Sequence, residues 1–357
     1  MAEREQQRPP AAGLRGRGAA SNPPNRFARL HYVREADDPA APAPPTQFFR
    51  DASRSIISCN DSPDVGFEVS INPYRGCEHG CIYCFARPTH EYLGFSAGLD
   101  FETKILVKED APVLLERALA SPRWQPRPLA LSGVTDPYQP VERRLQLTRR
   151  CLQVLVAFRQ PVVVVTKSAL VTRDLDLLQE LARVQAAAVY LSITTLDETL
   201  CRLLEPRASQ PPRRLAALTA LAAAGIPAGV LVAPVIPGLT EHELPAILAA
   251  AARAGARFAG YSLLRLPHAV AELFQQWLEQ HFPARKAKVL GRLRALRGGA
   301  LHDTRFGTRL RGEGLDAEQL AALFRLACRK SGLSPHAPAL SSAAFRRPTT
   351  QLSLFAP

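Results

Sequence analysis

The sequence predicts an α/β fold in which parallel strands form an open, partial (βα)6 TIM-like barrel. Six short apolar runs alternate with amphipathic stretches of helical period, and the last five runs begin roughly 27 to 40 residues apart, the length of one strand-helix unit. A dinucleotide-binding sheet is less favoured, because the sequence lacks the early Gly-x-Gly-x-x-Gly turn typical of that fold. Eight units are not visible, so the barrel is expected to be incomplete.

The predicted elements follow one another along the chain. Runs such as PVVVVTK consist of β-branched residues, which suits strands covered by helices. The stretches between them place apolar residues on one face of a helix. Strands are predicted at 67–71, 128–133, 161–167, 188–194, 228–234 and 258–264, and helices at 141–157, 172–184, 211–224, 241–253, 269–280 and 316–329.

Composition divides the chain into four regions. Residues 1–60 are predicted to form a disordered N-terminal arm, because most of this region is rich in Pro, Ala and Arg. The barrel is expected at 61–283, a basic helical extension at 284–333, and a flexible tail at 334–357. Prolines and glycines interrupt the long uncharged stretch 215–240, so no membrane span is predicted.

Charge is concentrated in one segment. The net charge is +13, with 39 Arg and 6 Lys, and residues 285–311 hold nine cations against the single acid Asp303. This +8 segment predicts salt-sensitive phosphate binding to nucleic acid. The structural alternative is a solvated amphipathic helix, whose apolar stripe consists of Val289, Leu293 and Leu296. The excess of Arg would then reflect the base composition of the genome and not a ligand. The start lacks the apolar core of a secretory signal, so a cytoplasmic protein is expected.

Three cysteines form a C-x3-C-x2-C loop after the first predicted strand. Gly76 and Gly80 let the backbone of this loop fold so that the thiolates of Cys77, Cys81 and Cys84 can converge on one centre. A [4Fe-4S] cluster held by three thiolates leaves one iron open to a substrate or cofactor. Zinc, with His79 or His90 as a fourth ligand, and plain buried thiols are the alternatives.

The loop resembles the signature of the radical S-adenosylmethionine superfamily, C-x3-C-x-aromatic-C, with Tyr83 as the aromatic residue. Together with LSGVTDPYQPVE (131–142), it is similar to the group related to spore photoproduct lyase, often described as DNA-repair photolyase-like, over roughly residues 15 to 330. The resemblance implies a partial barrel, a [4Fe-4S] cluster on the three cysteines, and S-adenosylmethionine as cofactor. It also implies reductive cleavage to a 5′-deoxyadenosyl radical, with electrons from a flavodoxin-type or ferredoxin-type donor.

The resemblance also suggests cofactor contacts, each with a structural alternative. After the second strand, Ser132, Gly133 and Asp136 suit an ammonium group, although they also suit a turn. Lys167 and Arg207 are cations for a carboxylate; the alternatives are a solvated strand end and a salt bridge with Glu205. Ser192 is a candidate ribose contact or a locally satisfied hydroxyl, and residues 229–241 form an adenine-side segment or a plain core strand.

One position departs from the family pattern. Spore photoproduct lyases have a hydrogen-donating cysteine directly after the second strand, where this chain has Ser132 and Gly133. The spore-photoproduct reaction itself is therefore not expected. Tyr138 is a candidate hydrogen relay, with packing as the alternative. The remaining cysteines are expected to be small buried apolar residues; they are Cys59, Cys151, Cys201 and Cys328.

The peptide from Gln351 to Phe355, QLSLF, is similar to the motif by which bacterial repair proteins bind the replication sliding clamp. Its large apolar side chains are unfavourable in water unless they dock in a partner or on their own domain. Altogether, the sequence predicts a radical enzyme that acts on nucleic acid in DNA repair. The alternatives are the same chemistry on a protein or small molecule, and a zinc-stabilised nucleic-acid-binding module without catalysis.

Overall fold

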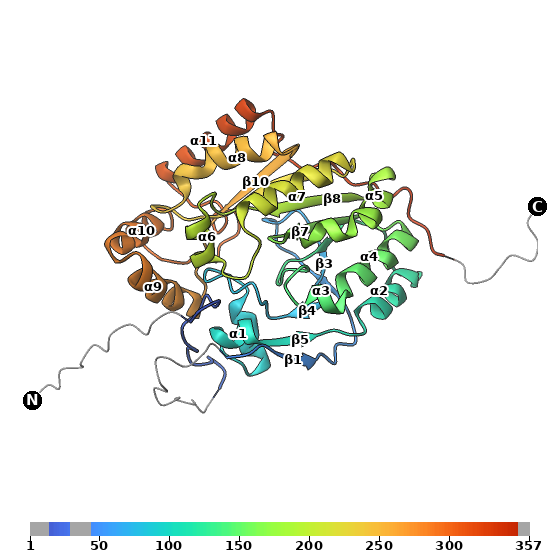
Figure 1. Ribbon diagram of the computed structural model, residues 1–357, viewed down its shortest axis with the longest axis horizontal. Helices are drawn as coiled ribbons and strands as arrows, with labels where there is room; N and C mark the ends of the chain where they lie inside the picture. The colour runs from blue at the N-terminus through green and yellow to red at the C-terminus, as the bar shows by residue number, and fades with distance from the viewer. Residues whose placement is uncertain (1–13, 29–43, 349–357) are drawn as a thin grey trace, which may run out of the picture.

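A seven-stranded sheet forms the centre of the computed structural model, which describes residues 14–28 and 44–348 (Figure 1). The strand order is β10-β9-β8-β7-β6-β3-β2; all neighbours run parallel except β2, which pairs antiparallel with β3. The edge strands β2 and β10 do not pair, so the predicted partial (βα)6 barrel is confirmed. The strands are β2 (Ile57–Cys59), β3 (Val69–Ile71), β6 (Leu129–Leu131), β7 (Val162–Thr166), β8 (Ala187–Ser192), β9 (Ala228–Val235) and β10 (Phe258–Leu263).

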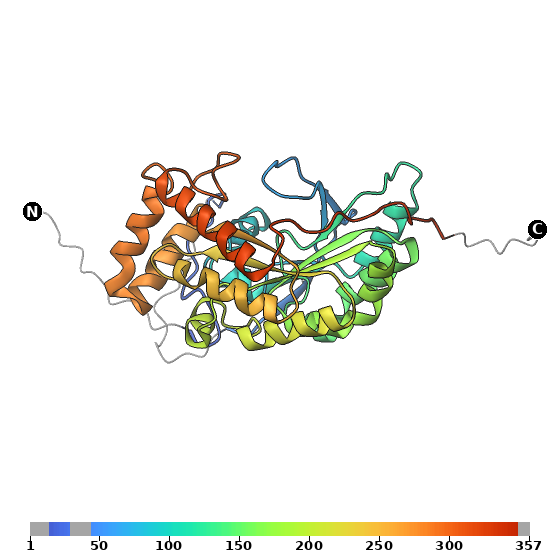
Figure 2. The same ribbon diagram turned by 90° about the horizontal axis from the view of Figure 1, so that it is seen from above.

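Amphipathic helices cover one side of this sheet, as Figure 2 shows for the green and yellow segments. In β7 the side chains of Val162 and Val164 are fully buried, and the apolar faces of the helices pack over such strands. The helices are α2 (Ala111–Ala120), α3 (Glu142–Leu145), α4 (Leu147–Phe158), α5 (Leu175–Arg183), α6 (Glu198–Leu204), α7 (Pro211–Ala223) and α8 (Leu244–Arg253), with 3-10 turns η2 (Ala169–Asp174) and η3 (Glu241–Glu243).

Part of the predicted N-terminal arm is folded. A second, three-stranded sheet contains β1 (Gln47–Arg50), β5 (Lys104–Val107) and β4 (Tyr74–Arg75). Both β1 and β2 fall within residues 1–60, where disorder was expected. Strand β1 pairs with β5, which is far away in sequence, and all four of its side chains are exposed. A local apolar pattern therefore does not predict this strand.

The basic extension is helical, as its apolar stripe indicates. Helices α9 (Ala269–His281) and α10 (Pro283–Ala295) share a second hydrophobic cluster with the cysteine loop, whereas α11 (Leu315–Ser331) packs on α8. Val289, Leu293 and Leu296 are all buried. Short α1 (Leu99–Thr103) and the 3-10 helix η1 (Arg87–Leu93) complete the elements.

Residues 334–348 form a strap along the amino ends of the strands. Ser334 bonds to the backbone of β10, the amide of Ser341 donates to the carbonyl of Gln185 at 2.9 Å, and that of Arg346 donates to Phe158 at 2.9 Å. The predicted flexible tail is thus ordered up to residue 348, whereas the peptide from Gln351 to Phe355 lies outside the described residues. Within the described ranges, none of the helices combines the length and apolarity that a bilayer crossing needs.

Candidate functional site

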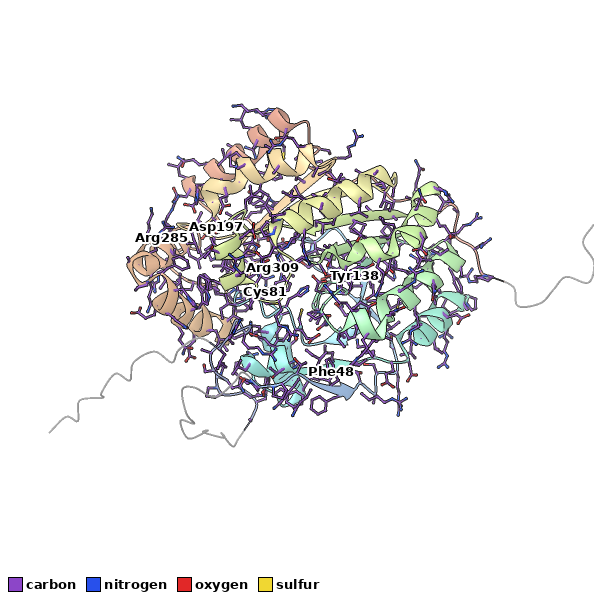
Figure 3. All side chains as sticks on the ribbon, in the orientation of Figure 1. Phe48, Cys81, Tyr138, Asp197, Arg285 and Arg309 are labelled. Carbon is purple, nitrogen blue, oxygen red and sulfur yellow. The ribbon has the colours of Figure 1, made fainter. Side chains whose placement is uncertain are left out.

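The cysteine loop lies at the carboxyl ends of the parallel strands, called here the mouth of the barrel. It begins after β4 with Gly76 and turns again at Gly80, both in the left-handed region with φ of +77° and +67°. A Cβ on Gly80 would lie 2.7 Å from a carboxylate oxygen of Glu102, so glycine is needed there. Cys81 is buried, and Figure 3 places it in the central part of the molecule.

Of the three thiols, Cys77 and Cys81 are buried and Cys84 is half-buried, and they lie near enough to influence one another's charge. Burial raises the pKa of Cys81 well above its ordinary value, and the nearby Glu205, Cys84 and Cys77 add to the effect. Burial and Cys77 also raise the pKa of Cys84 to about 11, against the opposing Arg87. Such thiols become thiolates readily only when a cationic metal centre offsets the burial. The donor set thus fits an iron-sulfur cluster bound by three cysteines.

The two histidines proposed as a fourth zinc ligand have other partners. His79 Nδ1 lies 3.3 Å from a carboxylate oxygen of Asp136. Burial opposes the charge on His79, but Asp136 and Cys77 outweigh it and raise its pKa to about 10. His90 Nε2 lies 2.9 Å from the carbonyl of Lys104. Across the part of the chain that the structure describes, no three His, Cys, Asp or Glu side chains are already grouped as metal ligands, and this includes Cys77, Cys81 and Cys84, so the fit to a cluster concerns the chemistry of the three thiols.

Residues 14–28 hold the cysteine loop from outside. The amides of Gly18 and Ala19 donate to the carboxylate of Glu102 at 3.0 and 2.8 Å. Glu102 in turn pairs at 2.5 Å with Arg87, and both side chains are fully buried. Arg87 also donates to the carbonyls of Gly80 and Cys81. This chain of bonds connects the N-terminal segment to the backbone of the cysteine loop.

Lys167 and Ser192 lie together at the mouth. The ammonium of Lys167, directly after β7, donates to Ser192 Oγ at 2.8 Å and to the carbonyl of Ala233 at 2.9 Å. It also lies 3.2 Å from Glu205 Oε1 and 5.6 Å from the ring centroid of Tyr83. Groups from β8, β9, the turn after α6 and the cysteine loop thus surround one ammonium.

Glu205 is the centre of this network, and the sequence reasoning considered it only as a partner of Arg207. Its buried carboxylate accepts hydrogen bonds from Tyr83, Thr194 and Arg214. Burial alone would raise the pKa of Glu205, but Arg214 and then Lys167 outweigh it and hold that pKa far below its usual range. Lys167 therefore has a permanent counter-charge. Glu205 follows α6, and no local pattern in the sequence distinguishes it.

Asp136 shapes the loop after β6. Its carboxylate accepts from Thr166 Oγ1 at 2.6 Å, the amide of Lys167 at 2.7 Å and the amide of Tyr138 at 2.9 Å. These bonds and His79 hold its pKa low despite the burial. With its oxygens so engaged, Asp136 acts as a positioning residue here, which agrees with the turn alternative.

Ser132 and Gly133 lie together at the end of β6 with unusual backbone angles. Their φ values are +142° and +117°, and Ser132 is one of few non-glycine residues with positive φ in the described ranges. Such strain concentrates where backbone approaches a ligand. Asn72 Oδ1 fixes the loop by accepting the amides of Val134 and Thr135 at 3.1 and 3.2 Å.

Arg207 pairs with Glu78. Its guanidinium lies 3.2 Å from Glu78 Oε1, whereas Glu205, its partner in the structural alternative, pairs with Lys167 and Arg214. It lines a cavity of ≈390 Å³ behind the cysteine loop, together with Arg143, Arg213 and other residues. The structure therefore does not bring Arg207 together with the Lys167 network.

The remaining candidates resolve individually. Tyr138 is buried, and its hydroxyl donates to Asp174 at 3.1 Å, which is a packing role. Cys151, Cys201 and Cys328 are buried as expected, but that expectation is wrong for Cys59, which is exposed on edge strand β2. An edge strand has one side without a neighbour, so its side chains reach solvent more easily.

Comparisons with known proteins agree with this geometry. The model of the Radical SAM superfamily matches residues 71–251. An uncharacterised protein of Mycobacterium tuberculosis is 40% identical over 219 residues, which are 61% of this chain and 64% of the mycobacterial protein. Another, from Methanocaldococcus jannaschii, is 28% identical over 224 residues, covering 63% of this chain and 80% of that protein. The chain thus matches less than two thirds of the mycobacterial relative.

Solved structures share the fold. Spore photoproduct lyase complexed with dinucleoside spore photoproduct has a TM-score of 0.56 and 18% identity, covering 80% of this chain and 81% of that one. A variant of that lyase with bound AdoMet and dinucleoside spore photoproduct has a TM-score of 0.54 and 18% identity, covering 80% of each chain. At this level of identity the similarity concerns the arrangement of the elements.

Proposed function

The chain belongs to the radical SAM superfamily and is a radical SAM enzyme, and on that premise we propose that it acts on nucleic acid in DNA repair. The observation that carries the proposal is the mouth of the barrel, where the cysteine loop, the Lys167 network and a group of arginines meet. The spore-photoproduct reaction is not proposed, since Ser132 and Gly133 stand where a thiol would be needed.

The residues of the mouth have distinct tasks in this proposal. Cys77, Cys81 and Cys84 hold a [4Fe-4S] cluster. The cluster and S-adenosylmethionine together supply a carbon radical that removes a hydrogen atom from the substrate. Lys167, held by Ser192 and neutralised by Glu205, presents a cation to the cofactor carboxylate. The strained loop 132–133 offers backbone groups to the cofactor amino group.

Support for a nucleic-acid substrate comes from two directions. A protein with this fold, spore photoproduct lyase, has been solved with a dinucleoside spore photoproduct. In this chain, residues 285–311 add +8 of charge beside the mouth, because α9 and α10 share a hydrophobic cluster with the cysteine loop. A cationic rim next to a radical site suits a phosphate-bearing substrate better than a neutral metabolite.

Anaerobic reconstitution tests the cluster assignment. Wild type should contain iron and sulfide, and with dithionite and S-adenosylmethionine it should yield 5′-deoxyadenosine. Cys81→Ala should lose both iron and product. Cys151→Ala is the matched control, because it removes an equally buried thiol from α4. Iron content unchanged in Cys81→Ala, or stoichiometric zinc without colour in wild type, would refute the assignment.

Substrate identity is tested by isotope transfer. The reduced enzyme is incubated with ultraviolet-irradiated or undamaged DNA deuterated at the sugar and the thymine methyl group. Deuterium in 5′-deoxyadenosine from the irradiated DNA is the expected result. Deuterium from neither DNA, with 5′-deoxyadenosine still formed, would favour a protein or small-molecule substrate.

Two partner predictions accompany this proposal. The reductant is expected to be a flavodoxin or ferredoxin, and the peptide from Gln351 to Phe355 is expected to bind the sliding clamp. The preceding residues are anchored, since Arg347 donates to the carbonyl of Trp124 at 2.9 Å. Deleting residues 351–355 should abolish clamp binding in a pull-down and leave iron content unchanged; persistent binding would contradict the prediction.

A further inference from the structure

Cations without a hydrogen-bonded carboxylate lie at the mouth, next to the cysteine loop. Arg265 follows β10 by two residues and is half-buried; its side chain has no hydrogen bond or ion pair among the described residues, and its buried Nε has no partner. Burial, then Arg309 and Arg297, lower its pKa to about 10. Its guanidinium carbon lies 5.3 Å from the ring centroid of Phe85, the neighbour of Cys84.

Arg297, at the end of α10, is in the same situation. It is 2% exposed, and its guanidinium donates to the carbonyls of Leu264 and Arg309 at 2.5 and 3.1 Å, but its buried Nε has no partner. Carbonyl groups satisfy its hydrogens without neutralising its charge. A buried guanidinium without an anion is costly, and native proteins seldom retain such groups unless they serve a ligand.

His302 completes the group. Its buried Nδ1 also lacks a partner, and its pKa is lowered to about 4 by burial and by Arg265, Arg297 and His268, against the weaker attraction of Asp303. His268, which caps the start of α9, has a positive φ of +49° that is rare for histidine. Three orphaned nitrogens and a strained backbone thus occur together.

The nearby acids do not balance these cations, because each is already paired. Asp64 binds Arg309 and the amide of Gly307. Asp303 binds Arg305 at 3.0 Å and Thr308 at 2.6 Å. These bonds also fasten the segment after α10 to the loop between β2 and β3, and Figure 2 shows both rising on the same side of the sheet. Because these two carboxylates are already paired, neither forms an ion pair with Arg265 or Arg297.

We propose that Arg265 and His302 bind a backbone phosphate of the substrate strand, with the charge of buried Arg297 behind them, while a base beside it stacks on Phe85. This inference rests on the proposed nucleic-acid function and locates the strand at the mouth. Arginine forks match phosphate oxygens, and an aromatic face binds bases of any sequence. Phe85 is 49% exposed although large and apolar, which suits a stacking surface. Because Phe85 follows Cys84, the base would lie next to the cluster.

The decisive variant is Arg265→Gln, tested in the reconstituted protein. Because Arg265 forms no hydrogen bond or ion pair among the described residues and only stacks on the ring of Phe85, its loss should change thermal stability little, yet weaken binding of a fluorescent single-stranded DNA about tenfold or more. The slope of log affinity against log salt should fall by about one. Arg325→Gln is the control, since it removes one exposed charge from α11, and should change affinity less than about twofold.

A neutral-backbone oligonucleotide separates this proposal from the general function. Wild type should bind a methylphosphonate analogue more weakly than DNA, and this difference should be smaller in Arg265→Gln, because one of the phosphate contacts is lost. If Arg265→Gln and Arg325→Gln weaken DNA binding equally, the effect of Arg265 is only its contribution to the net charge. This result would overturn the phosphate site and leave the proposed nucleic-acid function intact. If wild type binds neither oligonucleotide, the proposed function and the inference fall together.

A second readout uses the histidine. A bound phosphate raises the pKa of His302, so its binding takes up a proton. The groups facing His302 are Arg265 from the loop after β10, Arg297 from α10, His268 from α9 and Asp303 from its own loop. DNA affinity of wild type should therefore rise from pH 7 to pH 5.5, and rise less in His302→Gln. Equal pH profiles would overturn the role of His302.

Discussion

Gly18 should be indispensable for holding the cysteine loop, although it belongs to a segment that looks disordered in sequence. A Cβ at residue 18 would lie 1.8 Å from the carbonyl oxygen of Gly80 and 3.2 Å from the amide nitrogen of Ile82. Non-bonded atoms need about 3.5 Å, so Gly18→Ala requires a shift of about 1.5 Å. The obstacles are backbone atoms, which cannot rotate aside.

The size of the effect follows from the bonds that such a shift breaks. The amides of Gly18 and Ala19 are 3.0 and 2.8 Å from the carboxylate of Glu102, and a shift of this size removes both bonds. Hydrogen bonds to charged groups contribute about 1.5–3 kcal/mol each, so the docking of residues 14–28 loses about 3–6 kcal/mol. The docking equilibrium should weaken about 100-fold to 10,000-fold.

Limited trypsin digestion measures this directly, because cleavage follows the population of the opened segment. Cleavage at Arg15 and Arg17 should accelerate strongly in Gly18→Ala, and iron should be lost faster to a chelator. Gly66→Ala is the control, since a Cβ there meets nothing within 4 Å. Equal cleavage rates in the two variants would show that the segment does not depend on this close contact.

Three further changes probe the mouth and its surroundings. Glu205→Gln leaves Arg214 and Lys167 buried without their counter-charge, so urea titration of the apoprotein should show a loss of about 3–5 kcal/mol; a loss under about 1 kcal/mol would contradict this. Burial lowers the pKa of His90 to about 4, whereas the pKa in the unfolded chain is about 6.5. Neutral His90 therefore contributes fully to the free energy of unfolding above pH 6.5, and this contribution declines by about 3 kcal/mol as the pH falls to 4. His90→Gln should flatten that decline in acid titrations of unfolding, and an unchanged slope would exclude the histidine. Asn72→Ala releases the loop after β6 and should raise the KM for S-adenosylmethionine at constant iron content, whereas an unchanged KM would deny the loop a cofactor role.

The barrel could be predicted from sequence because each of its strands has a local signature. Apolar runs such as β7, between amphipathic helices, are buried whatever their neighbours are. The strands β1 and β2 could not be found in this way. All side chains of β1 are exposed, and β2 is an edge strand with mostly exposed residues, so only long-range backbone pairing defines them.

The residues of the site also fall into those that a local sequence pattern predicts and those that it does not. The cysteine spacing is a local motif and identified Cys77, Cys81 and Cys84 at once, and Lys167 and Ser192 were found because they follow strands. Glu205 has no such signature, because its role depends on Arg214 and Tyr83 from other elements. Arg265 was equally hidden, since a missing counter-charge becomes visible only when every neighbouring acid has been assigned to a partner.

The strap of residues 334–348 has a consequence for how the protein is made. It bonds to backbone near residues 257, 185, 158 and 124, in the reverse of the order in which the ribosome produces them. A nascent chain therefore completes all six strand-helix units before the amino ends of the strands acquire these last partners. Until residue 347 has left the exit tunnel, several carbonyl groups at that edge depend on water, and the unfinished chain should be more open to proteases and chaperones than the released protein.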